Sequence, residues 1–213
     1  QGIYIGDCKT DFASMCNDKL IGVRSYSEIT NNYDDAKVFG DTPPAKNGED
    51  YGGHGTHVAS TAAGNILVNV PYVQGETGKL ESDGIGTGLE FKQISGVAPH
   101  ANIIAYQICN PGNAGDTYSG CPTAPILKAL DDAIKDGVDV LNFSISGGGN
   151  PWNSATEQGF LAARNAGIFA AVAAGNTRAA TSTSPAINQT PYSTPKNAPW
   201  YTSVANSTHN RDI

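Results

Sequence analysis

The sequence predicts an α/β domain with a mainly parallel sheet and helices on both faces of that sheet. Short apolar runs of strand length alternate with segments of helical periodicity through the second half of the chain. Right-handed crossovers between parallel strands place such helices on both faces. The length of 213 residues suits one domain with a substantial core, so we expect residues 1–213 to form a single domain.

Five apolar runs predict the strands of this sheet. The run 101–109 is nearly continuous in apolar residues, which is typical of a strand buried on both faces. We expect the three later runs to be buried in the same way. In chain order the predicted strands are residues 20–26, 101–109, 138–145, 168–174 and 200–205.

Three segments predict helices. Apolar residues recur at helical spacing in 122–136, and a glycine follows this segment as it follows 152–165. In residues 50–64, small apolar residues at helical spacing come directly after a glycine-flanked histidine, His54. The polar segment 29–49 and the glycine-rich segment 70–95 are expected to be surface loops.

The charge and hydropathy of the chain exclude two classes of partner. The formal net charge is −7, whereas a general nucleic-acid binder usually presents a basic face. No apolar run approaches the roughly 18 residues that a membrane span needs, and no basic amphipathic segment is present. We expect neither a nucleic acid nor a membrane as partner.

The four cysteines indicate disulfide bonds. Cys8 and Cys16 form one close pair in the sequence, and Cys109 and Cys121 form another. Three complete pairings are open, and the local one is the one we expect. Neither pair has the C-x-x-C spacing of zinc or redox sites. Disulfides would indicate a secreted or extracytoplasmic protein.

The glycine-rich segment 70–95 carries several carboxylates. Its Gly84-x-Gly86-x-Gly88 pattern is weak as a phosphate loop, because no strand precedes it and no Gly-Lys-Ser/Thr follows. A calcium site is an alternative, and solvated carboxylates are the favoured interpretation. We expect no cofactor to be required for chemistry. The acidic residues are Glu76, Glu81, Asp83 and Glu90.

His54 is the first candidate for a reactive group. Gly52, Gly53 and Gly55 allow a substrate or backbone to approach the imidazole closely, which suits a general base. Metal binding with His57 is disfavoured, because a zinc-protease helix has its histidines four apart with a glutamate between them. A structural role in a core is the default for an isolated histidine.

Two predicted strands end in sequences that suit a ligand site. Ser144 to Gly148 follow one strand and could pair with an extended peptide, or could simply form the strand's exit. Asn176 follows Ala173, Ala174 and Gly175 at the end of the next strand. A Gly-Asn pair is usually a turn, but its side-chain amide could also donate into a cleft.

Taken together, these segments resemble the subtilisin-like serine proteases, the subtilase family. The segment 53–59 resembles the family's histidine motif, and 173–176 resembles the segment that carries its oxyanion-hole asparagine. The resemblance implies a subtilisin-like three-layer α/β/α fold. The other matching segments are 16–22, which is similar to one in larger secreted members, 95–101 and 141–148.

The resemblance implies roles for individual residues. His54 would be the general base and Asn176 the oxyanion donor. Substrate would bind along the ends of two predicted strands. The residues are Ala173, Ala174 and Gly175 at one strand end, and Ser144, Ile145, Ser146, Gly147 and Gly148 at the other.

Two parts of the family's triad are missing from this sequence. The family's aspartate stands in an Asp-Thr/Ser-Gly context, but Asp7 is followed by Cys8-Lys9 and does not fit. The Gly-Thr-Ser context of the nucleophile is also absent around Ser60, Ser144, Ser146 and Ser207. We therefore expect the middle of a catalytic domain, incomplete at both ends, with the aspartate strand before residue 1 and the serine helix after residue 213.

The resemblance implies a secreted serine endopeptidase that hydrolyses proteins by a Ser-His-Asp mechanism. Its partners would be protein or peptide substrates and the missing parts of the same domain, and the isolated chain would be inactive. An exposed sheet edge would favour self-association. The alternatives are a non-catalytic peptide-binding module on a degenerate subtilase scaffold, and a nicked chain of a two-chain enzyme.

Overall fold

The structure is a computed structural model, and it describes most of the chain. The described residues are 3–34, 47–50, 52–75, 84–110, 112, 118–145, 147, 149–175 and 196–207. The chain divides into two compact units, Gln1–Pro122 with Asp212–Ile213, and Thr123–Arg211. Each unit is described by itself.

The first unit contains a parallel sheet of three strands. Its order is β1 (Ile5–Gly6), β2 (Leu20–Arg24) and β5 (Ile103–Tyr106). Both strand pairs are parallel, which confirms the predicted class for this unit and the strands expected at 20–26 and 101–109. All four residues of β5 are only half-buried, so complete burial of this strand was a wrong expectation.

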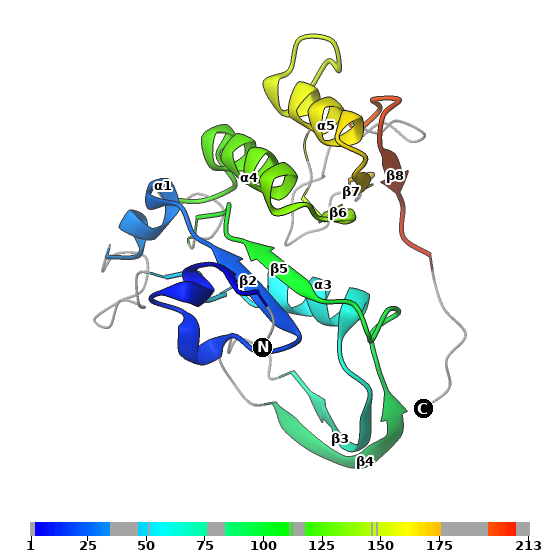
Figure 1. Cartoon of the computed structure of the whole chain (residues 1–213). Helices are drawn as coiled ribbons and strands as arrows, with labels where there is room; N and C mark the ends of the chain where they lie inside the picture. The colour runs from blue at the N-terminus through cyan, green and yellow to red at the C-terminus, as the bar shows by residue number, and fades with distance from the viewer. Residues whose placement is uncertain are drawn as a thin grey trace, which may run out of the picture. The chain divides into compact units, whose positions relative to one another are not determined.

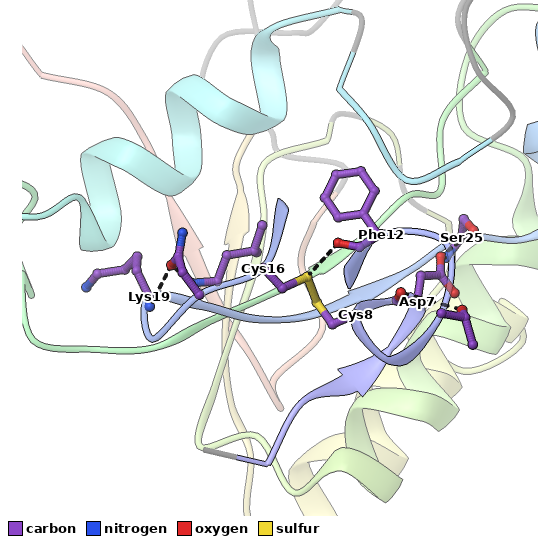
Figure 2. The surroundings of a disulfide bond; sticks show 9 residues. Asp7, Cys8, Phe12, Cys16, Lys19 and Ser25 are labelled. Carbon is purple, nitrogen blue, oxygen red and sulfur yellow. Dashed lines mark hydrogen bonds between the residues drawn. A yellow bond between two sulfur atoms is a disulfide. The ribbon is translucent and has the colours of Figure 1, made fainter. Parts of the chain in front are cut away.

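The residues before β2 pack through a disulfide bond. Cys8 joins Cys16 with a Cα–Cα distance of 5.7 Å, and Cys8, Phe12 and Val23 form a buried apolar cluster. Two short 3₁₀ helices, η1 (Asp7–Lys9) and η2 (Ala13–Met15), carry the chain around this bond, which Figure 2 shows. The second disulfide joins Cys109 to Cys121, so the local pairing is confirmed for all four cysteines.

After β2 the chain forms short helices and then the helix predicted around His54. α1 (Ser27–Thr30) and η3 (Asn31–Asp34) occupy the start of the segment that we expected to be a loop. α3 (His54–Ala63) begins at the histidine itself and ends before Gly64.

The segment after α3 is a two-stranded antiparallel ribbon and corrects a prediction. β3 (Leu67–Gln74) pairs with β4 (Ile85–Ile94), where glycines in the sequence predicted a loop. The apolar and β-branched residues of the ribbon are suited to strands, and the pairing of distant residues, such as Leu67 with Ile94, outweighs the loop preference of the glycines. Among the acidic residues of this segment, only Glu90 lies within the described part of the chain.

The second unit contains another parallel sheet and two helices. Its strands are β6 (Val140–Phe143), β7 (Phe169–Ala173) and β8 (Thr202–Val204), in that order. α4 (Thr123–Asp136) and α5 (Ala155–Asn165) pack against one another, and Leu130 lies directly against Gly159. Figure 1 shows these two helices side by side. The order of strand, helix and strand matches the prediction, and α5 starts three residues later because Ser154 caps it.

The strands of this second sheet are less buried than predicted. Val140 is 62% exposed, and its register partner Phe169 is 48% exposed. The neighbouring residues Ala170 and Val172 are almost completely buried, so β7 alternates between a buried and an exposed face. An alternating strand is covered on one face only, which is why the expectation of burial on both faces was wrong.

A charged pair lies in the core of the second unit. Glu157 of α5 is completely buried, Lys196 is 3% exposed, and Lys196 Nζ lies 3.6 Å from Glu157 Oε1. The ammonium group also lies over the rings of Phe143 and Phe160, 4.8 and 5.7 Å from their centroids. Burial lowers the pKa of Lys196, although Glu157 partly opposes that shift. Burial, followed by the nearby Glu157, raises the pKa of Tyr201.

Candidate functional site

His54 is presented at the first position of α3. The preceding residue, Gly53, adopts φ = 74°, a left-handed conformation that glycine takes without strain. A Cβ placed on Gly53 would have no heavy atom within 4 Å, so open space surrounds the turn before the histidine. The His54 side chain is exposed. An accessible imidazole at a glycine-flanked turn is what the sequence predicted for a general base.

Asp50 holds this turn, and sequence reasoning did not assign it a role. Its Oδ1 accepts a hydrogen bond from the Gly53 backbone N–H at 3.0 Å. Its Oδ2 accepts from the backbone N–H and the hydroxyl of Thr56, at 2.7 and 2.8 Å. The signal that could have revealed it is an aspartate shortly before a predicted helix start, because carboxylates satisfy the free N–H groups of a first turn.

The far end of α3 is fixed by the segment that leads to β5. The backbone N–H groups of Gly96, Val97 and Ala98 donate to the carbonyls of Gly64, Thr61 and Ala62, respectively, at 2.9–3.0 Å. These bonds satisfy carbonyl groups that a helix C-terminus leaves free. The segment 95–101, which the family resemblance singled out, therefore supports the histidine helix.

Gly96 provides a test of this support. A Cβ at Gly96 would lie 2.3 Å from the Gly64 backbone nitrogen, and backbone atoms cannot move aside easily. We expect Gly96→Ala to destabilise the protein by about 1–3 kcal/mol, measured by urea unfolding. The control is Gly86→Ala in β4, where a Cβ meets nothing within 4 Å, and no loss is expected there. Equal stabilities of the two variants would contradict close packing at Gly96.

In the second unit, two predicted substrate-binding segments lie next to each other. β6 and β7 are parallel neighbours, with Phe143 opposite Val172, so both segments follow the carboxyl ends of adjacent strands. Ser144 Oγ accepts a hydrogen bond from Asn142 Nδ2 at 3.0 Å, and the Ala174 N–H donates to the Val204 carbonyl at 2.9 Å. Ile145, Gly147 and Ala173 are also described, whereas Ser146, Gly148 and Asn176 lie outside the described residues.

Gly175 precedes the predicted oxyanion donor and has a restricted conformation. Its φ is 106°, a value that residues with a Cβ rarely adopt. The positive φ that a Gly-Asn pair favours is therefore present at Gly175, whereas Asn176 lies outside the described residues.

Asp7 has a structural partner. It lies directly after β1, and its carboxylate accepts hydrogen bonds from the backbone N–H and the hydroxyl of Ser25, as Figure 2 shows. Among the described residues, no hydrogen bond joins Asp7 to His54. Asp7 therefore fastens η1 to the carboxyl end of β2.

Neither a metal-binding cluster nor a membrane-spanning helix occurs in the described residues. That part of the chain contains no group of three or more His, Cys, Asp or Glu side chains that could hold a metal ion. The carboxylates Glu76, Glu81 and Asp83 lie outside it, so the calcium alternative stays untested. No helix in the described ranges is both long and apolar enough to cross a bilayer.

Comparison with known proteins gives the family of this chain. Residues 12–213 match the model of the subtilase family. The subtilisin-like protease SBT4.10 of Arabidopsis thaliana is 33% identical over 211 residues, covering 98% of this chain and 23% of that protein. SBT1.7 of the same plant is 34% identical over 216 residues, covering 98% of this chain and 24% of that protein.

A solved structure also matches. It is that of fervidolysin from Fervidobacterium pennivorans, a keratinolytic enzyme related to subtilisin. It is 22% identical to this chain, with a TM-score of 0.41, and the match covers 78% of this chain and 23% of that one.

The chain belongs to the subtilase family, a class of serine proteases. It spans about a quarter of the length of the curated relatives that it matches. The family that the histidine and asparagine motifs indicated is confirmed, and with it the subtilisin-like α/β class.

Proposed function

We propose that this chain is part of a secreted subtilisin-like serine endopeptidase and that His54 is its general base. The observation that carries the proposal is the exposed imidazole of His54 at the first position of α3, in a chain that belongs to the subtilase family. A helix that is held at both ends gives such a base a fixed position. A fixed position is what proton transfer in a transition state requires.

In the complete protein, His54 would take the proton of a serine hydroxyl while the serine oxygen attacks the peptide carbonyl. The imidazolium would then return that proton to the leaving amine, and water would hydrolyse the acyl-enzyme by the same steps. Asn176 would donate a hydrogen bond to the oxyanion. An aspartate outside residues 1–213 would orient the imidazole.

The substrate would be an extended peptide. Ser144 and Ile145 follow the carboxyl end of β6, and we propose that the backbone from Ser144 to Gly148 pairs with it as an added strand. Because the pairing uses backbone groups, it suits a protease that accepts many sequences. Ala173, Ala174 and Gly175 would border the same substrate from the neighbouring strand end.

The experiment compares the full-length protein with the isolated chain of residues 1–213. We expect the full-length protein to cleave casein and to be labelled at a serine by a fluorophosphonate, because both need a complete triad. The isolated chain should do neither. A full-length protein that binds peptides but gives no cleavage and no labelling would support the non-catalytic module instead. Casein cleavage by the isolated chain would show that its inactivity was wrongly proposed.

We also propose that the protein is exported. Two disulfide bonds close short loops at the ends of strands in the first unit, and such bonds persist in oxidising compartments. Recovery of the native protein from the extracellular fraction with both disulfides formed would support export. Recovery from the cytosol with four free thiols would contradict it.

Self-association of the isolated chain follows from one sheet edge. Within the described residues of the second unit, β6 pairs with β7 on one side and with no strand on the other. Unpaired strand edges favour pairing with another chain. We therefore expect light scattering of the isolated chain to give a mass that rises with concentration. A constant monomer mass at all concentrations would contradict this expectation.

A further inference from the structure

The turn before His54 lacks the usual means of support. Gly53 stands at the N-cap position of α3 and has no side chain to accept from the first N–H groups. Gly52 and Gly53 are exposed, and a Cβ on Gly53 would touch nothing. Two successive exposed glycines have a large backbone conformational freedom. Something else must therefore fix the position of His54.

Asp50 provides that support from outside the helix. Its carboxylate accepts hydrogen bonds on both sides of His54. Oδ1 accepts from the Gly53 N–H, and Oδ2 accepts from the Thr56 N–H. The acceptor is charged, and hydrogen bonds to a charged acceptor are stronger than neutral ones. The His54 backbone is therefore held between two points of attachment to the same side chain.

Asp50 is itself anchored to the sheet of the first unit. The carbonyl of the preceding residue, Glu49, accepts a hydrogen bond from Gln107 Nε2 at 3.0 Å. Gln107 directly follows β5, and its backbone N–H donates to the Arg24 carbonyl at the end of β2. A continuous series of contacts therefore links the strand ends to the first turn of α3. The turn before His54 is therefore connected through Asp50 to hydrogen-bonded strands.

We propose that Asp50 is a positioning residue for His54, which it keeps in place for proton transfer without touching the substrate. This inference rests on the proposed function of His54. Because His54 acts in the chemical step, its misplacement should lower kcat and leave KM nearly unchanged. A displacement of about 1 Å can cost 10²-fold in rate.

The test uses the full-length protein and three variants. We expect Asp50→Ala to lower kcat by about 30–100-fold, with KM within twofold of the unmodified protein. Asp50→Asn keeps one acceptor oxygen and should recover part of that loss, ending about 3–10-fold below the unmodified protein. Thr61→Val is the control, because it removes a hydrogen bond within the same helix, from Thr61 Oγ1 to the His57 carbonyl, and leaves both contacts of Asp50 in place. The kcat of Thr61→Val should stay within about twofold of the unmodified protein.

The outcomes separate positioning from general helix stability. Equal losses of kcat in Asp50→Ala and Thr61→Val would overturn the proposal, since any weakening of α3 would then be sufficient. An unchanged kcat in Asp50→Ala would overturn it as well. A large rise in KM with constant kcat would show that Asp50 acts on substrate binding, and it would also contradict the proposal.

A second measurement is independent of catalysis. In the full-length protein, hydrogen exchange of the Gly53 and Thr56 amides should become about 10-fold faster in Asp50→Ala, because both lose their acceptor. Unchanged exchange would overturn the proposed support. Full-length activity that survives His54→Ala would instead overturn the proposed function, and the catalytic role of Asp50 with it, while the exchange rates still decide whether Asp50 holds the turn.

Discussion

Replacing His54 with alanine in the full-length protein is expected to lower kcat by about 10⁶-fold, the effect that loss of the catalytic histidine has in subtilisin, a member of the same family. The reason is that no other group would take the proton of the attacking serine. The exposed imidazole contributes no buried contacts, so the variant should fold normally. The measurement is single-turnover hydrolysis of a peptide ester, with circular dichroism to verify the fold.

The matched control for this variant is His100→Ala. His100 is also exposed and belongs to the same unit, but it lies in the turn before β5. We expect its kcat to stay within about twofold of the unmodified protein. A similar loss of activity in both histidine variants, or less than a tenfold loss in His54→Ala, would contradict the role of His54 as general base.

Removal of one partner of the Glu157–Lys196 pair is expected to cost about 3–5 kcal/mol of unfolding free energy. Lys196→Met leaves the completely buried Glu157 carboxylate without its cation. Glu157→Leu removes the carboxylate beside the buried Lys196 ammonium, which lies over the rings of Phe143 and Phe160. In either case the remaining buried charge loses this oppositely charged partner, which costs free energy whether the charge stays or is neutralised. Urea unfolding of each variant measures the loss.

The double variant Glu157→Leu/Lys196→Met distinguishes the cost of an unpaired charge from the value of the pair. Since it removes both charges and keeps similar volumes, we expect it to be as stable as the unmodified protein or about 1–4 kcal/mol more stable. A double variant less stable than either single variant would contradict this account.

An exposed pair provides the control for these measurements. Lys135 lies 2.6 Å from Asp131 on α4, and both side chains are more than half exposed. We expect Lys135→Met to leave the unfolding midpoint unchanged within error, because water and salt screen surface pairs. A loss equal to that of Lys196→Met would show that burial does not govern the effect.

The buried pair joins two segments of the second unit that are distant in the sequence. Lys196 and Glu157 are far apart in the sequence, and Trp200 Nε1 also donates to the Glu157 carbonyl at 2.9 Å. The segment before β8 is therefore fastened to α5 by both a charge and a backbone contact. Neither residue carried a signal in the sequence, where a lysine and a glutamate are normally read as solvent-exposed.

Local patterns were sufficient to predict the helices of the second unit. The spacing of Ile126, Leu130 and Ile134 and the glycine after α4 act within one helix, so the sequence contains all the information needed. The same holds for α5, which begins three residues after the predicted start because Ser154 caps it. The His54 motif was also local, because the glycines and the helix follow one another directly.

Features that depend on distant residues were not predicted. The glycines of the β3–β4 ribbon predict a loop, but the two strands stabilise each other through pairing between distant residues. The half-exposed faces of β5 and β7 were missed because an apolar run does not reveal whether anything covers it. Whether other residues cover a strand face depends on tertiary packing, so an apolar run alone does not predict it.

For this protein the sequence by itself determined the family, the general base candidate and which apolar segments form the parallel strands, since each is indicated by motifs or apolar runs of neighbouring residues. Tertiary structure decided how His54 is held. Gln107 reaches Glu49, the residue before Asp50, from a distant strand end, and Gly96 packs against the end of α3. These contacts form only when separate segments meet, and their energies depend on distance and burial, which no local pattern encodes.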